Sequence, residues 1–282
     1  MRFATFHLQG APTWGMIEGE EAIDLGAVVG ERYPDLKSVL AADALAEVAK
    51  AASHAPRHPL SAIGWLPVLP NPDKILCVGL NYEMHRQETG RAVVENPTIF
   101  GRFANSQIGH GMDLVRPHVS HELDFEGELA IIIGKPGRYI TRADAFAHVA
   151  GYACYNDGSI RDFQRHTHQF TPGKNFPGTG AFGPWMMTPD ELGELPSLRL
   201  QTRVNGQVVQ DATFAQMIFD IPHIIEYCSS FTRLEPGDVI ATGTPGGVGA
   251  KRTPPLWLKP GDVVEVEIDR LGTLRNGVAQ EA

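Results

Sequence analysis

The chain has 282 residues and a net charge of −9, with 43% apolar and 20% charged residues, which are ordinary values for a globular protein. Because nucleic-acid phosphates require a basic surface, the negative charge and the lack of a basic run argue against a nucleic-acid partner. The length allows one large domain, or a main domain with a small appendage.

The start of the chain lacks the apolar core of a signal peptide, and no apolar run approaches the roughly 20 residues that span a bilayer. The three cysteines, Cys77, Cys154 and Cys228, are widely spaced and odd in number, so we expect buried free thiols rather than a disulfide framework. A cytoplasmic location and no membrane partner are therefore expected.

Residues 1–68 are predicted to form a small N-terminal α+β domain. Short strands are expected near residues 3–6 and 14–17, with a hairpin turn at 18–20. The helix formers of residues 41–52 predict one helix. Five prolines between residues 56 and 72 indicate a linker, so the second domain should cover residues 69–282.

The second domain is predicted to be mostly β with some α. Buried or alternating strands are expected at residues 75–79, 129–133, 198–204, 238–242 and 263–268. Helices are expected at about 82–90, 141–147 and 213–230. Asn205-Gly206 predicts a two-residue hairpin turn. The regular strand–helix alternation of a doubly wound sheet is missing.

An acidic segment before a core strand is the first candidate site. In a strand, Asp124, Glu126 and Glu128 would point the same way, and a hard cation with oxygen ligands would offset the cost of burying them. The competing interpretation is an acidic, solvated strand end. Asp157, after a largely apolar run, could supply a third carboxylate, although a turn or helix N-cap there is the more ordinary role.

Two further segments carry candidate catalytic groups. His85 and Glu88 are three residues apart and would share a helix face, where the carboxylate could orient the imidazole as a general base. A surface His–Glu pair is the alternative. The glycine-rich segment 242–249 could bind a carboxylate or enolate oxygen through backbone N–H groups, or could simply be a tight turn.

A loop rich in Pro and Gly contains Lys174, whose single cation could stabilise a developing oxyanion. The nearby His166 and His168 could be read as a zinc pair. We do not favour zinc, because no third soft ligand stands nearby and the carboxylates elsewhere indicate oxygen ligands.

The order and spacing of these motifs are more specific than any one of them. The series is N-Y-x-x-H-x-x-E at 81–88, P-T-I-F-G-R at 97–102, D-F-E-G-E-L-A at 124–130, G-Y-x-x-x-N-D-x-S-x-R-D-x-Q at 151–164, K-N-F at 174–176, T-G-T-P-G-G-V-G at 242–249 and L-K-P-G-D-V-V-E-V-E-I at 258–268. Over about residues 70–280 the chain resembles the fumarylacetoacetate hydrolase superfamily, and most of all its bacterial branch with a short N-terminal domain.

The resemblance implies a mixed β-roll, a homodimer, and Mg²⁺ or Mn²⁺ bound by Glu126, Glu128 and Asp157. It implies a catalytic dyad of His85 and Glu88 on a lid that closes over a 2-oxo acid substrate. The remaining expected catalytic or substrate-binding residues are Lys174, Gln164, Arg102, Thr244, Gly243 and Tyr82, of which Tyr82 would chiefly position the lid. Arg102 replaces a lysine of many relatives, and because arginine binds carboxylates bidentately a dicarboxylate could be preferred.

The reaction implied first is metal-dependent hydrolysis of a C–C bond in a small 2,4-dioxo acid of the acylpyruvate or fumarylpyruvate type, through an enolate. The same enolate chemistry could serve an isomerase or decarboxylase of 2-hydroxymuconate-type diacids or oxaloacetate in aromatic catabolism. Pro177, where relatives commonly have an acidic residue, leaves the substrate open. An inactive module that binds oxo acids is a third interpretation, which an intact dyad disfavours.

Overall fold

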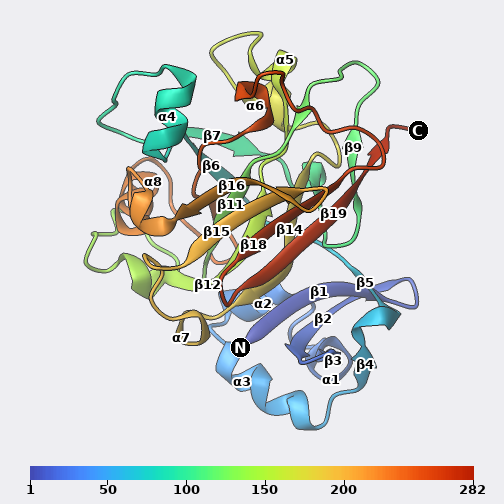
Figure 1. Ribbon diagram of the computed structural model, residues 1–282. Coiled ribbons are helices and arrows are strands. Elements are labelled where there is room, and N and C mark those ends of the chain that lie inside the picture. Colours follow the sequence, from blue (N-terminus) through green and yellow to red (C-terminus); the bar gives the residue numbers. More distant parts are fainter.

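The N-terminal part folds as a small sheet with short helices in the computed structural model, which describes residues 1–282. Figure 1 shows it below the rest of the molecule. Its elements are β1 (Arg2–Leu8), β2 (Ala11–Glu18), β3 (Glu21–Asp24), α1 (Gly26–Val29), α2 (Leu36–Ala41), α3 (Leu45–Ala49), η1 (Lys50–Ser53), β4 (Arg57–Pro59), η2 (Leu60–Ala62) and β5 (Ile63–Trp65). The predicted strands and the hairpin turn between β2 and β3 are confirmed.

Two expectations for this part were wrong. The single helix expected at 41–52 is broken, because Asp43 adopts a left-handed backbone (φ 52°) between α2 and α3. The Pro-rich segment is not a free linker either, since β4 pairs with β3 and β5 pairs with β1. The pairing of β1 with β14 (Gly180–Met187) joins the N-terminal sheet to the main one. The domain boundary near residue 68 stays a prediction.

The main sheet holds the strands that carry the site. From β14 it continues through β12 (Val149–Asn156), β11 (Gly127–Ile133), β17 (Val239–Ala241), β6 (Ile75–Gly79) and β7 (Thr98–Arg102). The β11–β12 pair is antiparallel and β6–β17 is parallel, so the sheet is mixed. Every residue of β11 is buried, which explains its continuous apolar run. The short β8 (Gln107–Ile108) pairs with β14.

A second sheet covers one face of the first, in the order β16 (Gln207–Thr213), β15 (Arg199–Val204), β18 (Val263–Ile268), β19 (Gly272–Gln280) and β9 (Asp113–Arg116). The predicted turn between β15 and β16 is confirmed, with positive φ at Asn205 and Gly206. The sheets meet closely at Gly127, where a Cβ would lie 2.0 Å from Thr202 Oγ1. The short pair β10 (Leu123–Asp124) and β13 (Ser159–Ile160) lies apart from both.

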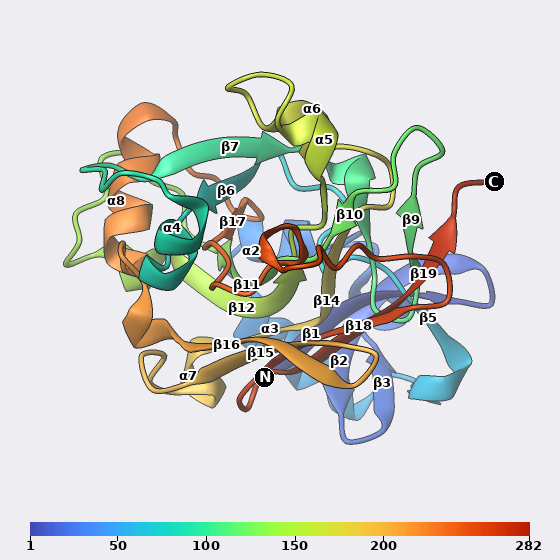
Figure 2. The same cartoon turned by 45° about the horizontal axis from the view of Figure 1, so that its top comes forward.

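Helices gather around one end of the sheets. Figure 2 looks onto this end, with α4 (Glu83–Thr89) on one side and α5 (Arg161–Gln164) and α6 (Thr171–Lys174) on another. The expected helix at 82–90 is confirmed. The helix expected at 213–230 is η5 (Phe214–Gln216) followed by α8 (Ile221–Phe231), and that expected at 141–147 is reduced to η4 (Ala145–His148). The remaining short helices are η3 (Ala104–Ser106), α7 (Pro189–Leu192) and η6 (Gly249–Lys251).

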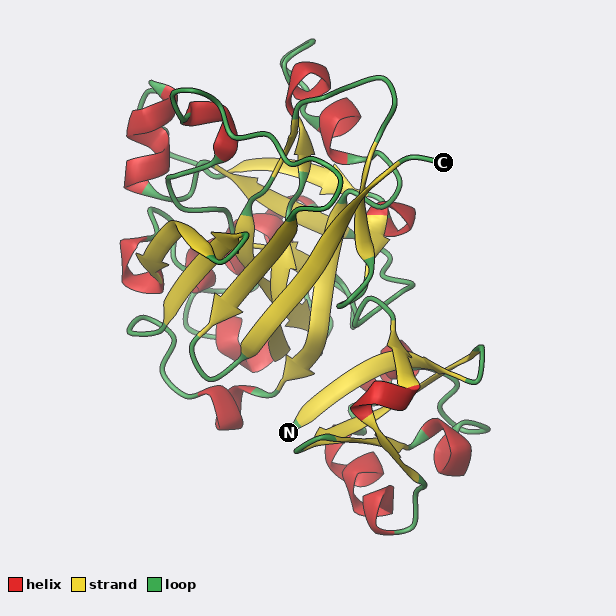
Figure 3. Cartoon of the chain, turned by 45° about the vertical axis from the view of Figure 1, so that its right-hand side comes forward, coloured by secondary structure: helices red, strands yellow, loops and turns green.

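The fold is mostly β with peripheral helices, as predicted and as Figure 3 shows by colour. The largest core cluster lies between the two sheets and includes Phe125, Leu129, Ile131 and Val266. All three cysteines are free and buried, as expected. None of the helices has the length and apolarity needed to cross a membrane.

Candidate active site

Three buried carboxylates form the centre of the site. Glu126 lies in the link between β10 and β11, Glu128 lies in β11, and Asp157 follows β12. One ligand oxygen of each lies within 4.8 Å of the others. The antiparallel pairing of β11 with β12 sets Gly127 opposite Asn156, and this brings Asp157 beside the two glutamates. The three residues predicted to bind the metal are therefore in one cluster.

Buried cations contact two of these carboxylates. Lys174 Nζ donates to Glu126 Oε2 at 2.7 Å and to Asp157 Oδ2 at 2.5 Å. Arg161 Nη2 lies 2.6 Å from Glu126 Oε1, and Arg102 Nη1 donates to Asp157 Oδ1 at 2.6 Å. These cations hold the pKa of Glu126 well below its usual range, although burial alone would raise it.

Glu128 differs from the other two because it forms no ion pair. Its Oε2 accepts only the backbone N–H of Gly243, at 2.8 Å. Burial, followed by the charges of Asp157 and Glu126, raises the pKa of Glu128 well above 4.5. A buried carboxylate without a cation is costly, and a divalent ion among the three oxygens would remove that cost. The oxygen donors therefore fit a hard ion such as Mg²⁺ or Mn²⁺.

His85 and Glu88 form the predicted pair on α4. His85 Nδ1 lies 2.6 Å from Glu88 Oε1, and the other carboxylate oxygen accepts from Gly247 N at 3.0 Å. Both oxygens of Glu88 are therefore held, which fixes the orientation of the imidazole. The second ring nitrogen of His85, Nε2, makes no hydrogen bond within the chain, and His85 lines the same cavity as Glu126 and Glu128.

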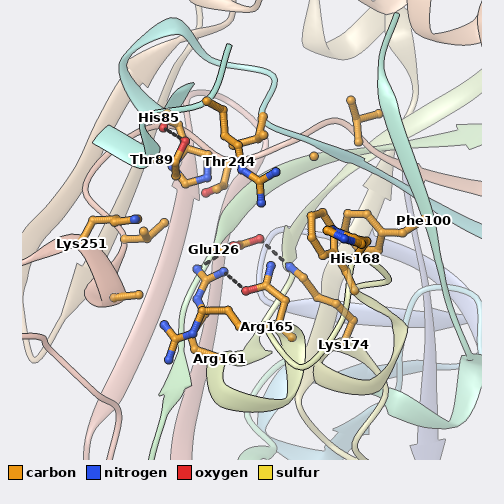
Figure 4. Close-up of a pocket in the computed structure, with 18 of the residues that line it drawn as sticks. His85, Thr89, Phe100, Glu126, Arg161, Arg165, His168, Lys174, Thr244 and Lys251 are labelled. Atoms are coloured by element: carbon orange, nitrogen blue, oxygen red, sulfur yellow. Dashed lines mark hydrogen bonds and ion pairs between the residues drawn. The ribbon is translucent and has the colours of Figure 1, made fainter. Parts of the chain in front are cut away.

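This cavity has a volume of about 460 Å³ and is rich in cationic side chains. Figure 4 shows His85 and Thr244 on one side, Lys174 and Phe100 on another, and Arg161 and Arg165 below Glu126. Gln164 also lines it, and its Oε1 accepts from Arg161 Nη1 at 3.0 Å. The lining cations and histidines are His85, Arg91, Arg161, Arg165, His166, His168, Lys174 and Lys251.

Three N–H groups of the glycine-rich segment bind carboxylates of the protein itself. Gly243 N donates to Glu128, Gly247 N donates to Glu88, and Gly249 N donates to Asp124 Oδ1 at 2.8 Å. These three N–H groups are therefore occupied, and the binding of a substrate oxygen by the rest of the segment stays a prediction. Asp124 is likewise no ligand, because its oxygens are taken by this segment and by Arg161.

Three residues expected to contact substrate lie outside the cavity. Arg102 is fully buried and bonds Asp157 rather than lining the cavity, and its role in substrate binding stays a prediction. Tyr82 is buried at the N-cap of α4, and Gly243 contacts Glu128 only through its backbone. Thr244 does line the cavity, but its hydroxyl already donates to Gly127 O at 3.0 Å.

Sequence reasoning gave no role to two supporting residues. Arg161 lies within a quoted motif and contacts both Asp124 and Glu126. Its place in that motif, four residues after Asp157 and three before Gln164, was the available signal. Gln210 is 2% exposed and connects two segments that are distant in sequence. It accepts from Gly127 N at 2.9 Å and donates to Thr244 Oγ1 at 2.8 Å. No local pattern marks it.

Comparisons with known proteins agree with this geometry. Residues 74–279 match the family described as Fumarylacetoacetate (FAA) hydrolase C-terminal. The chain is 43% identical over 229 residues to the mitochondrial oxaloacetate tautomerase FAHD2A of Homo sapiens, covering 80% of this chain and 73% of that protein. It is 43% identical over 215 residues to the oxaloacetate tautomerase YisK of Bacillus subtilis, covering 74% of this chain and 71% of that protein.

The similarity to solved structures of this superfamily extends over the whole chain. The fumarylacetoacetate hydrolase of Exiguobacterium antarcticum has a TM-score of 0.89 and 35% identity, with 100% of both chains covered. Maleylpyruvate hydrolase of Sphingobium sp. SYK-6, in complex with manganese(II) and pyruvate, has a TM-score of 0.84 and 29% identity, again with 100% of both chains covered. That complex and the buried carboxylates both support divalent-metal binding. This chain belongs to the fumarylacetoacetate hydrolase superfamily of enzymes.

Proposed function

We propose that this protein is a divalent-metal-dependent enzyme that removes a proton from the carbon beside the keto group of a small 2-oxo acid. Interconversion of the keto and enol forms of oxaloacetate is the reaction we put first. The observation that carries the proposal is that His85, held by Glu88, lines one cavity with Glu126 and Glu128, two of the three clustered carboxylates. The oxaloacetate tautomerase names of two relatives at 43% identity support this substrate.

The chain's own groups suit the proton transfer. A divalent ion at the carboxylates would lower the pKa of the C–H bond beside a coordinated keto group. Glu88 holds His85 Nδ1, so Nε2 is free to accept the proton from C3 of the substrate. As that C–H bond breaks, its electron pair forms the C2–C3 double bond. His85 then donates the same proton to the C2 oxygen, so the keto and enol forms contain the same atoms.

The charge of the cavity supports a substrate with two carboxylates. Lys251, at the end of η6, lines the cavity and forms no ion pair, and the same holds for Arg91 after α4. Because no protein carboxylate pairs with them, these cations are available for the second carboxylate of a diacid. His166 and His168 line the cavity as well.

The test follows the ultraviolet absorbance of enol-oxaloacetate after it is added to metal-stripped protein, before and after Mg²⁺ or Mn²⁺. We expect rapid loss of the enol only when both protein and metal are present. Free metal without protein, and a Glu126→Gln variant with metal, are the controls. A rate equal to that of free metal in the same buffer would contradict the proposal.

Hydrolysis of an acylpyruvate or fumarylpyruvate is the second candidate. Two observations favour it: the similarity to a maleylpyruvate hydrolase, and a cavity of about 460 Å³, which is roomy for a four-carbon diacid. Here His85 would take a proton from the attacking water, and Lys174 and Gln164 are the residues predicted to hold the resulting oxyanion. Proton NMR separates the two, because hydrolysis yields pyruvate and a free acid whereas tautomerisation only exchanges the C3 protons.

We also propose Mg²⁺ or Mn²⁺ as the ion and a homodimer as the assembly. The oxygen ligands support the first choice. Sedimentation equilibrium with and without metal tests the second, and a monomer under both conditions would contradict it.

A further inference from the structure

Each of the three carboxylates at the proposed metal site has one oxygen held by a group other than Lys174, whose ammonium lies against the second oxygens of Glu126 and Asp157. For Glu126 this group is Arg161, and for Glu128 it is the backbone N–H of Gly243. For Asp157 this oxygen is Oδ1, and the donor is the guanidinium of Arg102.

We infer that Arg102 is a positioning residue for the metal site, which fixes Asp157 so that this carboxylate presents a single oxygen, Oδ2, to the ion. The inference rests on the three-carboxylate site that the proposed function uses, but it concerns metal affinity and not turnover. Lys174 contacts the presented oxygen at 2.5 Å, so Oδ2 faces the interior of the cluster and Oδ1 faces away from it.

The residues around Arg102 hold its guanidinium in one orientation. Nη1 donates to Asp157 Oδ1 at 2.6 Å and to Gly158 O at 2.8 Å, and Nη2 donates to Thr179 Oγ1 at 3.0 Å. The side chain is fully buried. A Cβ at Gly180 would lie 2.7 Å from Nη2, so the absence of a side chain there makes room for the guanidinium.

A planar guanidinium and an ammonium would act differently at this position. Arg102 contacts Asp157 and Gly158 with one nitrogen and braces the other on Thr179, so the group cannot rotate without breaking a buried hydrogen bond. A lysine has one nitrogen and no second arm. Partners that orient a ligating residue commonly change metal affinity by about 10 to 100-fold when they are removed.

The single-oxygen geometry matters for the ion as well. Mg²⁺ requires near-octahedral coordination and usually keeps positions for water or substrate. If Asp157 turned and bound with both oxygens, it would occupy a position that a 2-oxo acid needs. Arg102 prevents this turn because it holds Oδ1 through a charge-assisted hydrogen bond in a buried place.

The test measures Mn²⁺ affinity of the full-length, metal-stripped protein by the electron paramagnetic resonance signal of free Mn²⁺, without any substrate. We expect Arg102→Met to bind Mn²⁺ about 10 to 100-fold more weakly than the wild type. Arg102→Lys should be weaker by about threefold or more, because one donor replaces the braced guanidinium. Arg142→Met, which removes a surface pair with Asp220, is the matched control and should leave the affinity unchanged.

A double-mutant cycle separates positioning from a general loss of positive charge. In an Asp157→Asn background, Arg102→Met should weaken Mn²⁺ binding by less than about threefold, because the residue it positions is already altered. Full additivity of the two changes would overturn the inference. So would wild-type affinity in Arg102→Met or, if that variant does not fold, in Arg102→Lys. Failure of the wild type to bind Mn²⁺ at all would instead refute the site itself, and failure to turn over oxaloacetate would leave the inference untouched.

Discussion

Replacing Glu128 with glutamine should stabilise the metal-free protein while abolishing its response to metal. Glu128 is buried, has no cationic partner, and lies within 4.8 Å of two other carboxylates. At that distance and an effective dielectric constant of about 20, each like-charge pair costs about 3.5 kcal/mol. Glutamine keeps the shape and still accepts the Gly243 N–H, but it removes the charge.

Protonation limits the size of the gain. Because the pKa of Glu128 is raised above its ordinary value of 4.5, the native carboxyl takes up a proton rather than bear the full repulsion. The cost then grows by about 1.4 kcal/mol per pH unit above 4.5, to at most about 3.4 kcal/mol at pH 7. Stability of the wild type is therefore lost as pH rises above 4.5, and Glu128→Gln should be more stable by about 1 to 3 kcal/mol at pH 7 and nearly equal at pH 5.

Urea denaturation in the presence of a chelator, at pH 5 and pH 7, measures both values. Glu126→Gln is the matched control: it should destabilise the protein, because it leaves Arg161 and Lys174 buried with fewer partners. Added Mg²⁺ should stabilise the wild type and neither variant. A metal-free Glu128→Gln that is less stable than the wild type, or a gain that does not depend on pH, would refute the reasoning.

Three other outcomes are expected. Metal binding should release protons, since the raised pKa of Glu128 favours its protonated form until the ion binds. Calorimetry in two buffers of different ionisation enthalpy measures this release, and equal heats in the two buffers would contradict it. Glu88→Gln should lower kcat about 10² to 10⁴-fold and leave the Mn²⁺ affinity unchanged, because it disturbs His85 and none of the three clustered carboxylates. A parallel loss of Mn²⁺ affinity would show that Glu88 has a structural role instead. Lys251→Met should raise KM about tenfold for a diacid and leave KM for a monocarboxylic 2-oxo acid unchanged, since Lys251 is an unpaired cation of the cavity. An equal rise of KM for the two substrates would argue against a site for a second carboxylate.

Local signals were sufficient for several elements. The strand at 75–79, the strand at 263–268 and the Asn205-Gly206 turn lie where the pattern places them, because apolar periodicity and turn chemistry act over a few residues. The pairing of His85 with Glu88 follows from their spacing on α4. The helix expected at 41–52 failed because propensity alone did not reveal the left-handed residue Asp43.

The acidic segment shows where local reasoning stops. Asp124, Glu126 and Glu128 alternate as a strand would require, yet Asp124 is taken by Arg161 and the glycine-rich segment, and Asp157 completes the cluster instead. That choice depends on the register of β11 with β12, which no single segment contains. Gln210 was missed for the same reason.

By itself the sequence determined the mostly β class, the carboxylates suited to a hard ion and the pairing of His85 with Glu88, since these follow from residue chemistry and short-range spacing. Only the tertiary structure decided which groups are paired. It assigned Arg102 to Asp157, 55 residues away, and left Glu128 as the one member of the cluster without a cation. Which buried charges pair with one another depends on strand pairing and burial across the whole fold. For that reason Arg102, which the sequence suggested for substrate binding, bonds Asp157 instead.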